Sequence, residues 1–240
     1  MAVKFLASAD SAVIVEFGDR ADRAISDQVL ALGDRVRALG IAGVVELVPT
    51  FRSLTVHYDP LRISARDLIA AIEKALVSKS VLERRRRLWR VPVCYEREFA
   101  PDLESVARAT ELATEEVVRL HAGTRYHVYM IGFVPGFPYM GDLADALVLP
   151  RRADPRVHVP PGSVSIATNQ TAIYPIDSPG GWHLIGTTPI QLFDVRGNPP
   201  ALFAPGDAVE FELIGPQAFA KIRAATERRD YRVESTELAA

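Results

Sequence analysis

The sequence predicts an α+β domain over residues 1–80 and, after a linker at 81–88, a mainly β domain over residues 89–240. Three observations lead to this fold class. Apolar periodicity in the first eighty residues gives the order strand, helix, strand, strand, helix. Charged residues then gather between Lys79 and Arg87, as is typical of a linker. In the second half of the chain the helical period disappears, and short apolar segments alternate with clusters of glycine and proline.

The first domain opens with a β-rich segment at residues 12–17. Apolar residues then recur at helical spacing over residues 25–39, and Gly40 is placed to end that helix. Residues 44–48 form a second β-rich segment. In residues 53–58 apolar and polar side chains alternate, which predicts a half-buried strand.

Ser64 and Asp67 form a potential capping box for a helix over residues 68–76. The resulting order of strands and helices indicates a small α+β sandwich with a ferredoxin-like pattern.

The second domain is predicted to carry two short helices, residues 101–109 and 114–121, before its β-rich part. A closing helix is expected at residues 216–226, and the last dozen residues are polar and expected to fray. The predicted strands are 88–95, 128–131, 163–167, 172–176, 182–188, 191–194 and 208–213.

The composition argues against several functional classes. A formal net charge of -2 over 240 residues argues against a general nucleic-acid binder. Cys94 is the only cysteine, so an intrachain disulfide is excluded, and its apolar β-rich surroundings indicate a buried structural thiol. The chain lacks a signal-peptide core at its start and any run of roughly 18 apolar residues, so we expect a cytoplasmic protein.

Familiar catalytic motifs are missing from the sequence. Without HExxH, CxxC or paired-histidine spacing, no metal site is predicted, and G-x-S-x-G is absent as well. Residues 181–186 repeat the glycine spacing of a phosphate loop, but they lack its lysine and alternate like a strand. ATP, if the protein uses it, must therefore bind elsewhere in the chain or on a partner.

Residues 129–189 concentrate the glycines, prolines and aromatic residues of the chain. These clusters predict shaped loops, which either form the corners of a β-barrel or surround a pocket. Phe133, Phe137 and Tyr139 lie on the first loop. They either plug one end of the barrel or line a small-molecule site.

Residues 178–181, Ser-Pro-Gly-Gly, suit a type II turn with Gly180 at its third position. This turn either connects a hairpin or presents backbone N–H groups to an anion or a carbonyl oxygen, with Trp182 as a flat wall. Gln170 and Thr171 fall at another predicted turn. They either cap that turn or bind a ligand amide.

Arg156 belongs to a basic cluster with Arg151, Arg152 and His158. Such arginines are either solvated or form a clamp for a carboxylate or phosphate. His121, at a predicted helix end, is either a general base or a side chain that interacts with the helix dipole.

Several linked sequence words occur in one order within the second domain. They are GFVPGFPYMG from Gly132, LPRRADPRVHVPPGSVSIA from Leu149, QTAIYPIDSPGGWHLIGTTP from Gln170, and PGD from Pro205. Together they resemble the KipI-like family, also labelled allophanate hydrolase subunit 1 or 5-oxoprolinase B subunit, over residues 89–212. The first eighty residues resemble the family's N-terminal domain more weakly.

The resemblance implies that the second domain is a cyclophilin-like barrel. It also implies that the chain is the B subunit of an ATP-dependent 5-oxoprolinase, inactive alone, which converts 5-oxo-L-proline, ATP and water to L-glutamate. The implied partners are a homologous barrel protein, the C subunit, and a homologue of the A subunit. Two alternatives stay open: a KipI-like inhibitor of a sensor histidine kinase, and a carboxyltransferase or allophanate hydrolase subunit 1 in urea-type amide metabolism.

The resemblance also supports a set of site residues. His121 and Arg156 are the candidate catalytic residues. The candidate substrate-binding residues are Phe133, Phe137, Tyr139, Gln170, Thr171, Tyr174, Ser178, Gly180, Gly181, Trp182 and Thr187. Relatives usually carry arginine where this chain has Thr187, so a cation expected beside the Ser-Pro-Gly-Gly-Trp segment is missing.

Overall fold

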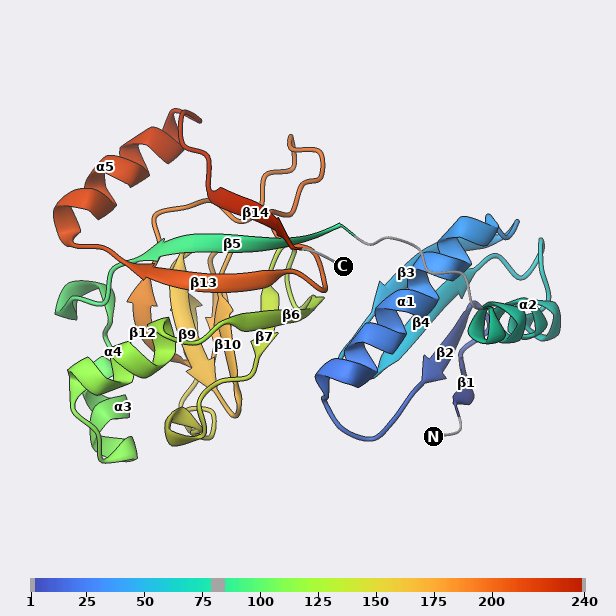
Figure 1. The fold of residues 1–240 in the computed structure, drawn as a ribbon, viewed down its shortest axis with the longest axis horizontal. Coiled ribbons are helices and arrows are strands. Elements are labelled where there is room, and N and C mark those ends of the chain that lie inside the picture. The colour runs from blue at the N-terminus through green and yellow to red at the C-terminus, as the bar shows by residue number, and fades with distance from the viewer. Residues whose placement is uncertain (1–2, 79–84, 239–240) are drawn as a thin grey trace. The chain divides into compact units, whose positions relative to one another are not determined.

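A computed structural model describes residues 3–78 and 85–238, which fall into two compact units (Figure 1). The linker was predicted at 81–88. Its first four residues lie outside the described part, but strand β5 already begins at Arg86, so the predicted linker extends too far. The backbone N–H of Arg87 donates to Asp207 Oδ1 at 3.0 Å, which helps to fix this part of the basic run in the sheet.

The first unit is an antiparallel sheet with the strand order β1-β2-β4-β3, accompanied by two helices. Its elements are β1 (Lys4–Ser8), β2 (Ala12–Glu16), α1 (Arg23–Leu39), β3 (Val44–Pro49), β4 (Ser53–Tyr58) and α2 (Ala65–Val77). Apolar residues of both helices and of the inner strands form one core, among them Val29, Leu32, Leu68, Ile72, Val15 and Leu54. The predicted order of elements is therefore present, with β1 as an additional edge strand.

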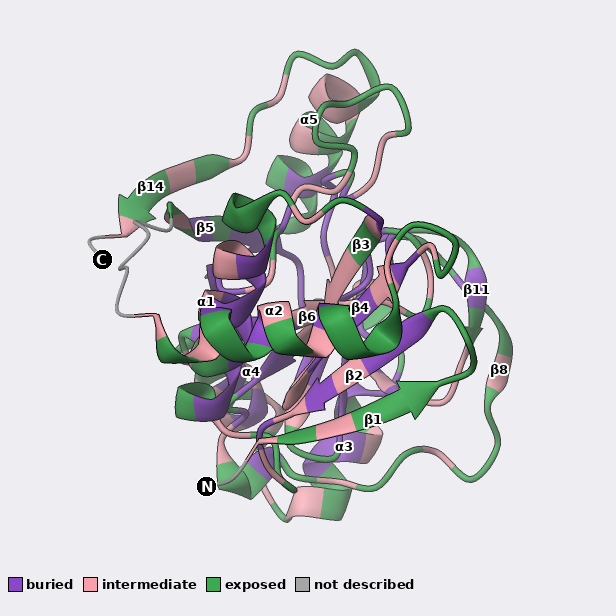
Figure 2. Ribbon diagram, turned by 90° about the vertical axis from the view of Figure 1, so that its right-hand side faces the viewer, coloured by how far each residue is buried: buried purple, intermediate pink, exposed green. Residues whose placement is uncertain are grey.

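Strand β1 was missed because it is mostly exposed and lacks a clear apolar alternation (Figure 2). Two local signals in this unit are confirmed. Gly40 ends α1 with a φ of 57°, in the left-handed region. Ser64 precedes α2, and its hydroxyl accepts the backbone N–H of Asp67 at 3.2 Å while donating to the Asp67 carboxylate at 2.7 Å.

The second unit begins with β5 (Arg86–Val93), α3 (Leu103–Thr110), α4 (Thr114–Ala122), β6 (Tyr126–Ile131) and β7 (Pro138–Gly141). It continues with β8 (Arg156–Val159), β9 (Ser163–Ala167), β10 (Gln170–Ile173), β11 (Ser178–Gly180) and β12 (His183–Thr187). It ends with β13 (Ala208–Leu213), α5 (Pro216–Glu227) and β14 (Glu234–Leu238).

Eight of these strands form one sheet in the order β12-β9-β10-β7-β6-β13-β5-β14, and β8 pairs with β11 separately. The unit is rich in β-sheet, as predicted, but its ladder does not close into a barrel within the described residues. Strand β14 pairs with the first half of β5. On its other side β5 runs parallel to β13. Within the described residues, the backbone pairing between β12 and the segment that follows β5 is a single bridge, in which Cys94 and Thr187 exchange hydrogen bonds of 2.9 and 3.0 Å.

The main core of this unit lies between the sheet and α3 and α4, which lie next to each other in Figure 1. A second, smaller apolar cluster is formed by Phe137, Val159, Ala167, Ala172, Tyr174, Trp182 and Leu184. Cys94 is a fully buried free thiol, and burial raises its pKa. Among the described residues, no helix is both long and apolar enough to span a membrane.

Candidate functional site

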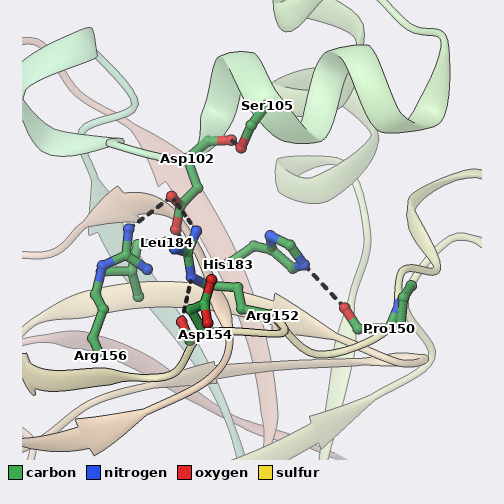
Figure 3. A network of polar contacts seen from close by, with 8 residues as sticks. All are labelled: Asp102, Ser105, Pro150, Arg152, Asp154, Arg156, His183 and Leu184. Atoms are coloured by element: carbon green, nitrogen blue, oxygen red, sulfur yellow. Dashed lines mark hydrogen bonds and ion pairs between the residues drawn. The ribbon is translucent and has the colours of Figure 1, made fainter.

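The carboxylate of Asp102 joins three segments of the second unit that lie far apart in the sequence (Figure 3). Its Oδ1 accepts hydrogen bonds from Arg156 Nη2 at 2.7 Å and Arg152 Nη1 at 3.1 Å. Its Oδ2 accepts the backbone N–H of Leu184 at 2.7 Å, and its own N–H donates to the Leu184 carbonyl at 2.9 Å. We call Asp102, Arg152, Arg156 and the Leu184 backbone the Asp102 network.

The network holds an ionised carboxylate in a buried position. Asp102 is only 4% exposed, and burial alone would raise the pKa of its carboxyl group. Hydrogen bonds from Arg156 and the Leu184 backbone, together with the two positive charges, nevertheless hold this pKa below its ordinary value. Two guanidinium groups share one carboxylate, so the network carries an excess of one positive charge.

Three buried polar atoms on β8, β11 and β12 have no hydrogen-bond partner among the described residues: Arg156 Nη1, Ser178 Oγ and His183 Nδ1. Strands β8 and β11 are paired, with Arg156 opposite Gly180. His183 Nε2 lies 2.9 Å from the Pro150 carbonyl, which can only accept, so Nε2 is the donor and, in the neutral ring, Nδ1 is the acceptor. A guanidinium donor and a hydroxyl are therefore unsatisfied on the paired strands β8 and β11, and an imidazole nitrogen is unsatisfied on β12, which Asp102 links to β8.

Unsatisfied buried groups are rare because each loses its hydrogen bonds to water without replacement. This set supplies candidate hydrogen-bonding groups for a small polar molecule, with Arg156 and Ser178 on the paired strands β8 and β11. Arg156, predicted from the sequence, belongs to it, and so does Ser178. Asp102 and His183 were missed. Only their spatial neighbours distinguish them from an ordinary helix cap and an ordinary strand residue.

The predicted aromatic residues do come together, around Phe137. Its ring centroid lies 5.4 Å from that of Phe133, 5.0 Å from Tyr139, 5.1 Å from Tyr174 and 6.0 Å from Trp182. Phe137, Tyr174 and Trp182 are buried, whereas Phe133 is 58% exposed. Most of this group therefore packs as a small core beneath the loop, rather than standing open as the wall of a cavity.

Gly180 is not the third residue of a type II turn, because its φ lies outside the left-handed region. Residues 178–180 form strand β11 instead. The physical reason for a glycine here is space, since a Cβ atom would collide with the Tyr174 hydroxyl. At Gly181 the nearest atom to such a Cβ would be Pro155 Cβ, at an ordinary 3.7 Å.

His121 is completely buried against the main core, and its hydrogen-bond partners are not members of the Asp102 network. Its Nδ1 is 2.8 Å from the Tyr95 hydroxyl and its Nε2 is 2.8 Å from Thr171 Oγ1. Because Thr171 donates its single hydroxyl proton to the Ser165 carbonyl at 3.0 Å, Nε2 must be the donor to Thr171. Tyr95 then donates to Nδ1.

Burial lowers the pKa of His121 to about 3, so this histidine is neutral at physiological pH. Its ring stacks on Phe211 with centroids 4.7 Å apart. The geometry thus gives both His121 and Thr171 a role in joining α4 to the sheet. The predicted turn is present before Gln170, which opens β10 opposite Ala167 across the two-residue connection of Thr168 and Asn169, whereas Thr171 lies within the strand.

Thr187 lies at the far end of β12 from His183, and its hydroxyl donates to the Phe99 carbonyl at 2.7 Å. A bulge between Leu184 and Gly186 shifts the register of that strand against β9. The expectation that Thr187 adjoins the Ser-Pro-Gly-Gly-Trp segment is therefore wrong. Thr187 instead lines a cavity at the other end of the strand.

A larger cavity, of about 880 Å³, opens between α3, α4 and the end of β13, but none of the predicted site residues lines it. The described residues also contain no group of three metal-ligating side chains. The Asp102 network and the unsatisfied atoms around it are therefore the candidate site that the geometry favours.

The sequence of this chain is similar to those of known proteins. Residues 3–203 match the family model described as carboxyltransferase domain, subdomain C and D. A Bacillus subtilis protein named as the B subunit of 5-oxoprolinase is 40% identical over 222 residues, which cover 88% of this chain and 92% of the relative.

Two solved structures show the same fold. TTHA0988 superposes with a TM-score of 0.77 at 35% identity; the match covers 85% of this chain but only 40% of TTHA0988. The Kluyveromyces lactis urea amidolyase superposes with a TM-score of 0.79 at 19% identity over 98% of this chain and 16% of that one, which shows a shared fold alone. From the extent of the family match and of the B. subtilis alignment, this chain belongs to the carboxyltransferase domain, subdomain C and D, family, in the branch of the 5-oxoprolinase B subunits.

Proposed function

We propose that this chain is the B subunit of an ATP-dependent 5-oxoprolinase and works with a homologous C subunit and a homologue of the A subunit. The observation that carries the proposal is the 40% identity to a 5-oxoprolinase B subunit over nearly the whole length of that relative. The urea-type alternative has only a distant likeness in support, and no contact among the described residues favours an inhibitor of a histidine kinase.

The Asp102 network suits the chemistry of opening a lactam. Negative charge develops on the carbonyl oxygen of 5-oxo-L-proline as the ring amide is activated. A guanidinium held in place by a buried carboxylate stabilises such an oxyanion without reorganising. Arg156 is held in this way through Nη2, and its Nη1 is the unsatisfied donor. We assign the lactam N–H to His183 Nδ1, the unsatisfied nitrogen on the residue next to Leu184.

ATP is a second substrate of the assembled enzyme and supplies the phosphoryl group that activates the carbonyl. The residues of this chain do not form a phosphate loop, because residues 183–187 form a strand and Thr187 stands where the lysine would be required. We therefore assign the nucleotide to a partner protein. A cytoplasmic location belongs to the same proposal.

The experiment is reconstitution with homologues of the A and C subunits, followed by measurement of ATP-dependent glutamate release from 5-oxo-L-proline. We expect activity from the three-component complex and none from this chain alone. Stable assembly without any glutamate release would contradict the proposal, and so would glutamate release by this chain by itself.

Variants of the network test the role of Arg156 in the same assay. Arg156→Lys removes the forked donor and is expected to lower kcat by about 100-fold, as for other single oxyanion donors. Arg119→Gln is the matched control, because Arg119 pairs with Glu116 on the exposed face of α4. An unchanged kcat in Arg156→Lys, in a complex that assembles normally, would remove Arg156 from the reaction.

A further inference from the structure

A cavity of about 360 Å³ lies at the end of β12 where Thr187 and Thr188 leave the strand. Its wall also includes Gly162, the segment after Thr188, and the helix α5. Three arginines line it: Arg196, Arg223 and Arg229. Thr187 and Thr188 are thus placed at the opposite end of β12 from His183 and the Asp102 network.

The charges around this cavity do not balance. Arg196 Nε lies 3.1 Å from Asp194 Oδ1, and Arg229 pairs with the second oxygen of the same carboxylate. Arg223 Nε lies 3.5 Å from Glu227 Oε1. Three guanidinium groups therefore share two carboxylates, which leaves an excess of one positive charge beside the cavity.

The cavity wall also contains two hydroxyl groups without partners. Thr188 Oγ1 and Thr226 Oγ1 have no hydrogen-bond partner among the described residues, although both atoms are buried. Thr188 is only 3% exposed, and its backbone N–H is fixed by the Gly162 carbonyl at 2.8 Å. Both threonines line the cavity, so an acceptor that reaches either hydroxyl there gives it the hydrogen bond that it lacks.

We propose that this cavity binds the oxyanion group of a small molecule, a carboxylate or a phosphate. Arginine is suited to both groups because its planar fork presents two parallel donors. The two threonine hydroxyls add neutral donors, so a bound oxyanion would offset the excess positive charge and offer acceptors for the missing hydrogen bonds. The cavity volume fits a metabolite of a few heavy atoms and lies in the lower part of the range of ligand pockets.

If the bound group is a carboxylate, it would come from 5-oxo-L-proline or glutamate, and the proposal then rests on the proposed function. If the bound group is a phosphate, the proposal does not depend on the proposed function. Calorimetric titration of the full chain with sodium phosphate, and separately with 5-oxo-L-proline, distinguishes the two sources. We expect one of the two probes to bind, with affinity that falls as sodium chloride is added, because exposed arginines are screened by salt.

Two substitutions locate the binding. Arg223→Gln is expected to weaken the bound probe at least tenfold, whereas Lys221→Gln, an exposed charge on the same helix outside the cavity wall, should leave its affinity unchanged. Thr188→Val removes an unsatisfied buried hydroxyl at constant shape. It should keep or raise the melting temperature while weakening the probe severalfold.

Failure of both probes to bind the folded wild-type chain overturns the proposal. Equal affinity in Arg223→Gln and Thr188→Val, each with an unchanged melting temperature, overturns it as well, because the probe must then bind elsewhere. Glutamate release by the reconstituted complex is measured separately. Loss of binding in this cavity and failure of the 5-oxoprolinase assignment are therefore distinguishable.

Discussion

Asp102 shows why residue identity predicts a candidate site incompletely. The sequence predicts a helix over residues 101–109 and no role for Asp102, which in the structure occupies the N-cap position of α3. Its side chain makes no capping hydrogen bond, however, and instead binds Arg152, Arg156 and the backbone of Leu184. Those partners lie 50 or more residues away, and no local pattern specifies them.

Gly180 was explained from the sequence by a type II turn, but the structure requires glycine there because a Cβ atom would collide with Tyr174. Gly180→Ala should lower the free energy of unfolding by about 1–3 kcal/mol, because the new methyl group collides with the buried Tyr174 side chain. Gly181→Ala is the control and should change stability by less than about 0.5 kcal/mol, since its methyl group has ordinary space. Urea denaturation of both variants measures the difference. Equal stability would mean that Tyr174 moves aside freely.

His121 gives a prediction about pH. Its pKa is about 3 in the folded chain, against an ordinary value near 6.5, because the buried site excludes the charged form. The unfolded chain therefore binds the proton first, so stability is fully present above about pH 6.5 and falls as the pH decreases toward 3. The slope approaches about 1.4 kcal/mol per pH unit.

His121→Gln should remove this contribution to the slope between about pH 5 and pH 6, measured by urea denaturation at each pH. The control is His158→Gln, because the His158 side chain is 78% exposed. A slope that persists in His121→Gln would assign it to other titrating groups.

At the scale of elements, the positions of helices and strands were predicted correctly where apolar periodicity and capping residues indicate them. Helices α1, α3, α4 and α5 and strands β9, β12 and β13 lie within a few residues of their predicted positions. It failed where pairing determines the structure. Strand β11 has the composition of a turn, β8 lies among charged residues, and β14 is polar in most positions. Each becomes a strand because a partner strand forms hydrogen bonds with its backbone N–H and C=O groups.

Strand β14 was expected to fray, yet it forms a ladder with β5 from Glu234, opposite Arg90, to Leu238, opposite Arg86. Removing residues 234–240 should therefore lower the free energy of unfolding by about 1–3 kcal/mol, the net contribution of a few backbone hydrogen bonds. It should also promote association through the newly exposed edge of β5. Thermal denaturation and size-exclusion chromatography measure the two effects. A truncated chain with the melting temperature and elution volume of the full chain would contradict the prediction.

At the scale of the whole molecule, sequence composition indicated the change of architecture but not the closure of the sheet. Within the described residues, the predicted barrel is an open eight-stranded sheet. The first part of β5 pairs with β14, and the segment after β5 pairs with β12 only through the bridge between Cys94 and Thr187. Closure depends on which strand ends meet across the fold. Alternation along a single strand contains no information about that.

The two compact units should fold independently, because each has its own apolar core. Residues such as Val29 and Ile72 pack within the first unit, and Val91 and Ile166 within the second. We expect separately expressed fragments 1–84 and 85–240 each to unfold cooperatively in urea, with the smaller fragment the less stable because it buries a smaller fraction of its surface. Circular dichroism gives the transitions, and amide dispersion in NMR spectra shows whether each fragment has fixed packing. If either fragment lacks a cooperative transition, its core depends on the other unit, and the predicted domain organisation fails.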